Sequence, residues 1–484
     1  MKKRLEIFCF LCYDKVIGWI TCTLKSEKGC GTMKRFLLLC LIFSLILSAA
    51  SLTAFADYTL PQYVRIGLMY GNGAVKTVTV ESDAGFLLGD YQEREFVKTA
   101  ETAETCLIVK LDSDGIAVCN ESGTLLHSGD SSVGILPNAS GMNQVLRVDE
   151  VSYRGGIHCI KAESAMTVVN VVFLDHYLYG VISREMSPSW PVEALKAQAV
   201  CARNYAAQSL NKHQSQGFDL CSGVDCQAYS GTKAEALGSY APVDETTRQV
   251  LTYDGKLAQL FYSSSMGATT EDVKNVWGNS LPYLISVDNS YEDTENIPNG
   301  VWEGYLSCEE ATTIMRNKGY DVGDVTDIKV LEYSANQRVV KMEVVGTKGS
   351  KVFEREACRT IFNTVTKSQA FTVTGDKGSG APASVQVTDG TDTVKLIADQ
   401  LVLLTGEGRE TLTGTLCVFD GEETKSYGGS ASGSKNKGFQ FSGTGWGHSV
   451  GMSQYGAKGM AEAGYTYQEI LAHYFVGTNL ENAY

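Results

Sequence analysis

One segment constrains the fold of this chain more than any other, because residues 190–211 have the pattern of a helix that other elements can approach closely. Ser189 is a residue type that caps helices. Pro191 lies in the first turn of the predicted helix, where backbone N–H groups have no partner within the helix, so the missing N–H of proline breaks no hydrogen bond. Six alanines between Ala194 and Ala207 leave little side-chain bulk. Apolar residues recur at helical spacing, at Val192, Leu195, Ala199, Ala202, Ala206 and Leu210. We therefore expect this helix at the centre of a domain.

Most of the remaining chain has the pattern of β-strands. Residues 63–69 and 76–80 alternate apolar and polar side chains, and the turn-forming residues 70–73 between them favour a hairpin. Residues 168–174 are nearly all apolar and rich in valine, which is typical of a buried strand. The sequence predicts an α+β fold, mostly β, with the Ala-rich helix packed in its main domain.

Composition shifts divide the chain into parts. We expect a leader, a β-rich N-terminal domain, a main domain that is interrupted by an inserted β module, and a C-terminal return to the main domain. Within the main domain, short helices are predicted near residues 309–318 and 465–475. The predicted boundaries are 1–56, 57–163, 164–365, 366–437 and 438–484.

The leader has the pattern of an export signal. Lys34 and Arg35 precede an apolar run over 36–47, and the triplet 54–56 (AFA) suits a signal peptidase, so cleavage is expected before Asp57. Met33 is the expected start, which would make 1–32 an upstream extension. An uncleaved membrane anchor is the alternative, although the run is shorter than the roughly 20 residues that span a bilayer. The expected location is outside the cytoplasm, secreted or associated with the cell wall or membrane.

The net charge of the chain limits the kinds of molecule that it is expected to bind. The formal net charge is −14 at pH 7, and the predicted leader is itself basic, so the remainder is more acidic still. An acidic surface disfavours nucleic acid and anionic lipid, whereas a weakly charged glycan polymer is compatible. Nine of the 14 cysteines follow Asp57, and an odd number spread over a long chain is unlike a disulfide scaffold.

Three long motifs carry a resemblance to a known family. They are 178–186 (LYGVISREM) running on to 194–200 (ALKAQAV), 261–267 (FYSSSMG) followed by 281–284 (LPYL), and 445–457 (GWGHSVGMSQYGA). In this order they resemble the stage II sporulation protein D family, also called the SpoIID/LytB family. The resemblance covers roughly residues 165–290 and 438–484. Met266 departs from the family pattern, which has glycine there.

The resemblance implies a peptidoglycan lytic transglycosylase of the sporulation branch, which cuts the bond after N-acetylmuramic acid in strands without stem peptides. It also implies that Glu185 is the catalytic residue. One carboxyl suffices when the C6 hydroxyl of the substrate attacks the anomeric carbon, whereas ordinary glycosidases use two. Apolar neighbours such as Ile182 and Met186 favour a carboxyl that keeps its proton. The alternative is a solvated surface glutamate.

Further residues of the motifs are candidates for binding the substrate. Arg203 is the expected partner of the lactyl carboxylate of muramic acid, with a structural ion pair as the alternative. The serines of the second motif bind sugar hydroxyls or only cap turns, and His448 lies between glycines that let backbone approach a ligand. A Ser–His hydrolase lacks its Gly-x-Ser-x-Gly motif here. The predicted set is Gln198, Arg203, Tyr205, Ser263, Ser264, Ser265, His448, Ser453 and Tyr455.

A metal site is predicted just after the central helix. His213, Cys221 and Cys226 offer an imidazole and two thiolates, ligands that suit Zn²⁺, and some members of the family hold zinc in this region. No fourth ligand is evident, so His448 or a water would complete the site. A disulfide or two free thiols are the alternatives.

Two other kinds of function remain open. The amidase-enhancer branch of the same family modifies another cell-wall hydrolase, and a plain wall-binding module is the third possibility. The expected partners are peptidoglycan glycan strands, with other cell-wall hydrolases or sporulation proteins as further candidates. Release of anhydro-sugars by the purified protein would separate the enzyme from the other two.

Overall fold

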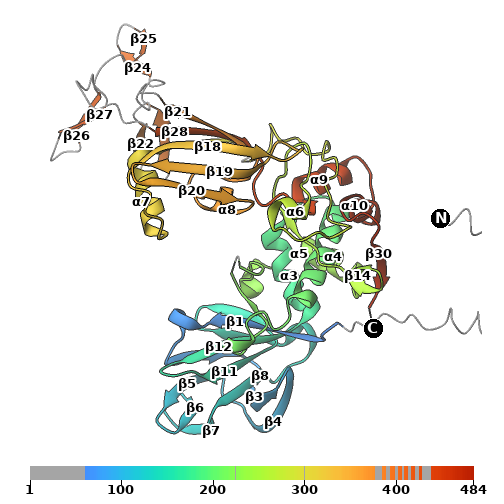
Figure 1. Cartoon of the computed structure of the whole chain (residues 1–484). Helices are drawn as coiled ribbons and strands as arrows, with labels where there is room; N and C mark the ends of the chain where they lie inside the picture. Colours follow the sequence, from blue (N-terminus) through green and yellow to red (C-terminus); the bar gives the residue numbers. More distant parts are fainter. Residues whose placement is uncertain are drawn as a thin grey trace, which may run out of the picture. The chain divides into compact units, whose positions relative to one another are not determined.

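The computed structural model describes residues 60–223, 225–298, 300–376 and 438–483, together with the backbone of six short strands between 384 and 427 (Figure 1). The predicted leader, with its cleavage site, lies outside these ranges. In the described part, no helix combines the length and the apolar character that crossing a membrane requires. More of the described residues lie in strands than in helices, which confirms the predicted α+β class.

Two packed sheets form the N-terminal part. A six-stranded sheet has the order β10-β9-β2-β5-β6-β7, and a seven-stranded sheet has the order β13-β1-β12-β11-β8-β3-β4. Their shared core contains apolar residues of both, for example Val80, Leu107, Ile135 and Val168. The strands are β1 (Tyr63–Met69), β2 (Thr77–Glu81), β3 (Phe86–Gln92), β4 (Glu95–Thr102), β5 (Cys106–Asp112), β6 (Gly115–Asn120), β7 (Leu125–Gly129), β8 (Ser132–Pro137), β9 (Val145–Val148), β10 (Val151–Arg154), β11 (Gly156–Lys161), β12 (Met166–Phe173) and β13 (Leu220–Cys221).

This pairing corrects two expectations. The predicted hairpin over residues 63–80 is wrong, because β1 pairs with β12 and β13 while β2 pairs with β5 and β9. Alternation identified both strands but not their partners. The buried strand predicted at 168–174 is β12, which pairs with β11, so the seven-stranded sheet crosses the boundary predicted between residues 163 and 164.

A helical layer with its own core follows β12. The Ala-rich helix α4 (Val192–Gln208) packs against α3 (Leu174–Glu185), α5 (Leu237–Glu245), α9 (Gln454–Glu462) and α10 (Tyr467–Tyr474). Eleven of its residues are buried, which confirms the central helix. Its N-cap is Pro191 with no side-chain cap, so the predicted capping by Ser189 is wrong. The other elements are η3 (Gln214–Gln216), η4 (Gly231–Ala234), α6 (Val273–Val276), β14 (Gln249–Tyr253), β15 (Lys256–Leu257), β16 (Tyr262–Ser263), β29 (Met452–Ser453) and β30 (Asn479–Asn482).

A third body has a separate apolar core that includes Met315, Val344, Phe362 and Phe441. The domain predicted over 164–365 therefore contains two cores. The predicted helix at 309–318 is α7, which begins with a capping box of Ser307 and Glu310. The elements are β17 (Val301–Ser307), α7 (Cys308–Asn317), β18 (Val325–Tyr333), β19 (Val339–Gly346), β20 (Gly349–Glu354), α8 (Ala357–Thr360), β21 (Phe371–Asp376) and β28 (Gly438–Thr444).

Strand β28 lies between β17 and β21 and carries the chain back toward the third motif. The predicted insert thus begins after β21, which belongs to this third body. Its described strands form three two-stranded ladders (Figure 1). They are β22 (Ser384–Thr388) with β23 (Thr393–Ile397), β24 (Val402–Thr405) with β25 (Gly408–Thr411), and β26 (Leu416–Phe419) with β27 (Thr424–Tyr427).

Candidate functional site

Glu185 is the last residue of α3, and its half-buried carboxylate meets the start of another helix. The helix ends there because Met186 takes an extended conformation and Pro188 follows. The side-chain amide of Gln454, the first residue of α9, donates to Oε2 of Glu185 at 3.2 Å. The first and third sequence motifs therefore meet at this carboxylate.

Two further donors approach Glu185, and one of them begins a buried chain of hydrogen bonds. The hydroxyl of Tyr262 and the backbone N–H of Ala228 both bond to the carboxylate. Tyr262 in turn accepts a bond of 2.9 Å from Nε2 of Gln227, whose Oε1 accepts one of 3.3 Å from the Tyr177 hydroxyl. The donor directions are consistent along this series of hydrogen bonds. The Tyr177 hydroxyl donates to Gln227, Gln227 donates to Tyr262, and Tyr262 donates to Glu185.

These surroundings set the charge state of the carboxyl. Burial is the largest influence and raises the pKa of Glu185 above its ordinary value, while the donors from Gln454, Ala228 and Tyr262 and the charge of Arg184 lower it only in part. Burial and the nearby Glu185 also hold the pKa of Tyr262 well above its usual range, so this hydroxyl remains a donor. A carboxyl that retains its proton at higher pH is what a general acid requires.

An aromatic pair lies next to the carboxylate along the chain. The rings of Trp190 and Tyr455 have centroids 4.8 Å apart, and the ammonium of Lys458 stands 5.8 Å from the Trp190 ring. Trp190 follows Glu185 by five residues, and Tyr455 directly follows Gln454. Both rings are half-buried, so part of each faces solvent.

A second cluster gathers the predicted metal ligands. Ligand atoms of His213, Cys221 and Cys226 lie within 4.8 Å of one another, and an oxygen of Asp225 joins them. Nε2 of His213 is 3.4 Å from Sγ of Cys226 and 3.4 Å from Oδ2 of Asp225. Two thiols, an imidazole and a carboxylate form a set of four ligands that suits tetrahedral Zn²⁺. Cys221 and Cys226 form no disulfide with each other.

The cluster adjoins the surroundings of Glu185 through the chain itself. Gln227 and Ala228 directly follow Cys226, and both belong to the hydrogen bonds around Glu185. Tyr205 is half-buried beside the cluster, where its hydroxyl donates to the Asp225 carbonyl at 3.4 Å. A group that orders the loop would therefore also hold Ala228, which bonds to Glu185, and Gln227, which bonds to Tyr262.

Comparison with known proteins relates this part of the chain to a family. Residues 162–253, which contain Glu185 and the cluster of His213, Cys221 and Cys226, match the family model described as stage II sporulation protein, SpoIID. Stage II sporulation protein D of Bacillus subtilis is 24% identical over 383 residues, covering 75% of this chain and 88% of that protein. Residues 162–253 therefore form a SpoIID domain, the domain of stage II sporulation proteins.

Two other relatives of this chain carry different names. The amidase enhancer of Bacillus subtilis is 30% identical over 329 residues, covering 63% of this chain but only 40% of the enhancer. An uncharacterized protein of Brachyspira hyodysenteriae is 27% identical over 331 residues, covering 68% of this chain and 72% of that protein. Residues 278–391, which include most of the third body, match a domain of unknown function.

The buried position of Arg203 corrects its predicted role in substrate binding. Its side chain has no exposed surface, and its guanidinium pairs with Asp175 at 3.0 Å and donates to the carbonyls of Val243 and Gln249. Arg203 therefore forms the structural ion pair that was predicted as the alternative to substrate binding. Gln198 is likewise fully buried on α4, away from solvent, and its amide has no hydrogen-bond partner among the described residues.

Two predicted sugar-binding serines are also structural. Ser265 and Ser453 are fully buried, and the hydroxyl of each donates to Glu292 at 2.5 Å. Ser263 is buried with an Oγ that has no partner within the described part of the chain, and Ser264 is half-buried. These last two remain candidates for substrate contact, as does Tyr455.

His448 lies against aromatic rings rather than beside the metal ligands. Its ring centroid is 5.0 Å from that of Trp277 and 6.1 Å from that of Phe261. Nδ1 accepts the Val450 N–H at 3.0 Å, and the ring also bonds to the Tyr262 backbone. Burial lowers its pKa to about 4, so the imidazole is neutral at physiological pH. The cluster does not include it, and the fourth residue that joins His213, Cys221 and Cys226 is Asp225 instead.

Sequence reasoning missed Asp225, Gln454, Tyr262 and Glu292. Asp225 precedes Cys226 directly, which is the one signal that was present. The others are contacts between distant parts of the chain, which no local spacing reveals.

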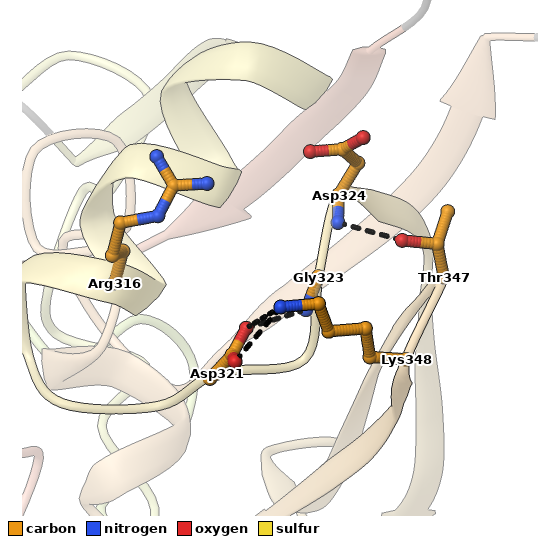
Figure 2. Close-up of a pocket in the computed structure, with 6 residues that line it drawn as sticks. All are labelled: Arg316, Asp321, Gly323, Asp324, Thr347 and Lys348. Atoms are coloured by element: carbon orange, nitrogen blue, oxygen red, sulfur yellow. Dashed lines mark hydrogen bonds and ion pairs between the residues drawn. The ribbon is translucent and has the colours of Figure 1, made fainter.

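A pocket of about 360 Å³ lies elsewhere, in the third body, and shares no residue with this site (Figure 2). It is lined by Arg316, Asp321, Gly323, Asp324, Thr347 and Lys348. Lys348 pairs with Asp321 at 3.0 Å, so two of its charges neutralise each other (Figure 2).

Proposed function

We propose that this protein is an exported lytic transglycosylase that cleaves the bond between N-acetylmuramic acid and N-acetylglucosamine in denuded peptidoglycan strands. The observation that carries the proposal is the surroundings of Glu185. Its carboxyl is half-buried, has a raised pKa, and bonds to amide, hydroxyl and backbone donors. A single carboxyl set in this way fits a reaction in which one group acts first as acid and then as base.

The reaction follows from that one group. Protonated Glu185 gives its proton to the glycosidic oxygen, and the bond from that oxygen to the anomeric carbon breaks. The C6 hydroxyl of the same muramic residue then forms a bond to the anomeric carbon, and the Glu185 carboxylate takes the hydroxyl proton. No water is consumed. Between the two transfers, Gln454 and Tyr262 stabilise the carboxylate, since a hydrogen bond to a charged group is worth about 1.5–3 kcal/mol.

The aromatic pair supports a glycan as the substrate. Trp190 and Tyr455 are half-buried aromatic residues that lie close to Glu185 and Gln454 along the sequence, and the apolar faces of sugar rings pack on aromatic rings. Lys458 adds a positive charge beside Trp190. Lys458 also pairs with Glu462 at 3.0 Å, but this pair is partly exposed, so its ammonium is more accessible to the lactyl carboxylate of muramic acid than the buried guanidinium of Arg203.

We also propose that His213, Cys221, Asp225 and Cys226 hold one Zn²⁺. The ligand atoms fit, because two sulfurs, one nitrogen and one oxygen lie within 4.8 Å of one another. When bound, zinc supplies a rigid link between ligands rather than a reacting group. The four residues would then hold the loop that presents Ala228 to Glu185 and Gln227 to Tyr262.

The test is digestion of denuded glycan by the purified protein. Transglycosylation leaves 1,6-anhydromuramic ends, whereas hydrolysis leaves reducing ends that are heavier by one water. Anhydro products that disappear in Glu185→Gln support the proposal. Reducing ends would instead require a second carboxylate.

The second candidate is an enhancer of a cell-wall amidase, which the 30% identity to the Bacillus subtilis amidase enhancer favours. Export and contact with other cell-wall hydrolases or sporulation proteins would suit either candidate. An enhancer would release no sugar alone but would raise the rate at which an added amidase cleaves intact peptidoglycan. The same preparation can be assayed both ways.

A further inference from the structure

Glu292 is a buried carboxylate that joins three separate stretches of the chain. Its residue is only 6% exposed. Oε1 accepts from Ser265 Oγ at 2.5 Å and from the Gly267 N–H at 2.9 Å, and Oε2 accepts from Ser453 Oγ at 2.5 Å. The remaining donors are the Met266 N–H at 2.9 Å, Asn289 Nδ2 at 2.8 Å and Thr294 Oγ1 at 3.2 Å.

Most of these donors belong to the two motifs that contact Glu185. Ser265 and its neighbours follow β16, which carries Tyr262. Ser453 ends β29, which pairs in parallel with β16, so that Tyr262 lies opposite Met452 and Ser263 opposite Ser453. Glu292 therefore fixes the ends of both paired strands.

Ser453 connects Glu292 to the surroundings of Glu185. Its hydroxyl hydrogen points to Glu292, which leaves its oxygen free to accept the Gly456 N–H at 3.0 Å as the N-cap of α9. The next residue is Gln454, the donor to Glu185. The orientation of one buried carboxylate thus sets the first turn of α9 and the amide that it presents.

The surrounding groups keep Glu292 in place. Asn289 donates to it and accepts a bond of 2.6 Å from the Tyr474 hydroxyl on α10. The buried guanidinium of Arg338, from the third body, attracts it and donates to the Met266 carbonyl at 2.5 Å. A buried carboxylate with this many partners is costly to disturb, because loss of one leaves others unsatisfied.

We infer that Glu292 is a positioning residue of the active site, which holds Tyr262 and Gln454 at hydrogen-bonding distance from Glu185 through the serines that it binds. The inference rests on the proposed function for its catalytic consequence. Its structural claim concerns the Glu185 carboxyl alone and can be measured without turnover.

The experiment compares Ser453→Ala with Thr466→Ala in the full chain. Both remove a serine or threonine N-cap, from α9 and α10 respectively, but Ser453→Ala also removes a buried donor to Glu292 and so costs more stability than the exposed Thr466→Ala. Only Ser453 links Glu292 to Gln454. Carboxyl NMR of glutamate-labelled protein, with the Glu185 signal assigned by its absence in Glu185→Gln, measures the pKa in each variant.

We expect Ser453→Ala to raise the pKa of Glu185 and to lower glycan cleavage about tenfold or more, the effect of one hydrogen bond to a charged group. Thr466→Ala should leave the Glu185 pKa unchanged. The double variant Ser453→Ala/Gln454→Ala should raise the Glu185 pKa no further than Gln454→Ala alone, and Glu292→Gln should act in the same direction.

Equal Glu185 pKa values in folded Ser453→Ala and Thr466→Ala would overturn the inference. If Glu292→Gln fails to fold, the comparison of the two caps decides alone. If wild-type protein releases no sugar, the proposed function fails, while the NMR titration still decides whether Glu292 positions the partners of Glu185.

Discussion

Nε2 of Gln454 lies 3.2 Å from Oε2 of Glu185, although 269 residues separate them in the sequence. The contact places the end of α3 against the beginning of α9 and brings the carboxylate to a helix N-terminus, where backbone N–H groups favour negative charge. Burial opposes that effect and has the larger influence on the pKa. The helix N-terminus favours the charged form of Glu185 and burial favours the neutral form. This balance suits the proposed role, in which the group both gives and takes a proton.

Glu185→Gln should abolish glycan cleavage while the protein stays folded. The amide is nearly isosteric with the carboxyl but neither gives a proton to the glycosidic oxygen nor accepts one from the C6 hydroxyl. The expected loss is about 10²–10⁴ in rate, the usual contribution of general acid–base catalysis. Product release measured by mass spectrometry checks the loss, and circular dichroism checks the fold. Full activity in this variant would remove Glu185 from the mechanism.

The same substitution should stabilise the protein at neutral pH. The pKa of Glu185 is higher in the folded state than in the unfolded state, so the protonated carboxyl stabilises the fold. This contribution to stability is fully present below the unfolded pKa and is lost as pH rises through the folded pKa. The amide that replaces the carboxyl in the Glu185→Gln variant stays neutral at every pH. Urea unfolding should show this variant more stable than wild type at pH 7 and equal to it near pH 3. A stability difference that is independent of pH would contradict this.

Local patterns predicted the parts of the fold that depend on local interactions. Helix α4 was found because the spacing of Ala199, Ala202 and Ala206 is a property of the helix itself. The partner of β1 was not predicted correctly, because alternation indicates a strand but not the strand beside it. In the structure β1 pairs with β12, which is distant in the sequence. The family resemblance identified Glu185, but its contacts with Gln454 and Tyr262 come from tertiary packing.

The errors in the candidate site have one physical source. Serines and arginines bind sugars and buried carboxylates with the same hydrogen bonds, so sequence alone does not distinguish the two roles. Ser265 and Ser453 donate to Glu292, and Arg203 pairs with Asp175. Each partner lies at least 27 residues away along the chain, and none has a pattern of its own.

Arg203→Leu should destabilise the protein strongly. It leaves Asp175, a mostly buried carboxylate, without its guanidinium partner, and breaking a buried pair costs about 3–5 kcal/mol. Arg184→Leu, an exposed position on α3, is the matched control and should change the free energy of unfolding by less than about 0.5 kcal/mol. Urea denaturation measures both. A small effect at Arg203 would mean that the pair is not needed for the fold.

His448 should remain neutral well below the ordinary pKa of an imidazole. Burial lowers its pKa to about 4, whereas the unfolded chain takes up the proton near 6.5. The unfolded state therefore binds more protons between these values, and the contribution of His448 to stability falls as pH drops from 6.5 toward 4. Nitrogen NMR of the imidazole should show no protonation at about pH 5.5, between these two values. A titration near the ordinary imidazole pKa would show instead that the ring is solvated.

Zinc should bind at about one equivalent and should be lost in Cys221→Ser. Cys221 is almost fully buried, and its thiol has three partner groups within 4.8 Å, so its removal takes away a ligand that water replaces poorly. Asp225→Asn should weaken binding but not abolish it, because Asp225 is the most exposed of the four and also pairs with Lys212. Since zinc binds only the folded loop, chelation should lower the melting temperature of wild type and leave that of Cys221→Ser unchanged. Elemental analysis and thermal unfolding measure these effects. A disulfide between Cys221 and Cys226 in the active protein, detected by mass spectrometry after alkylation, would show that the cluster is not a metal site.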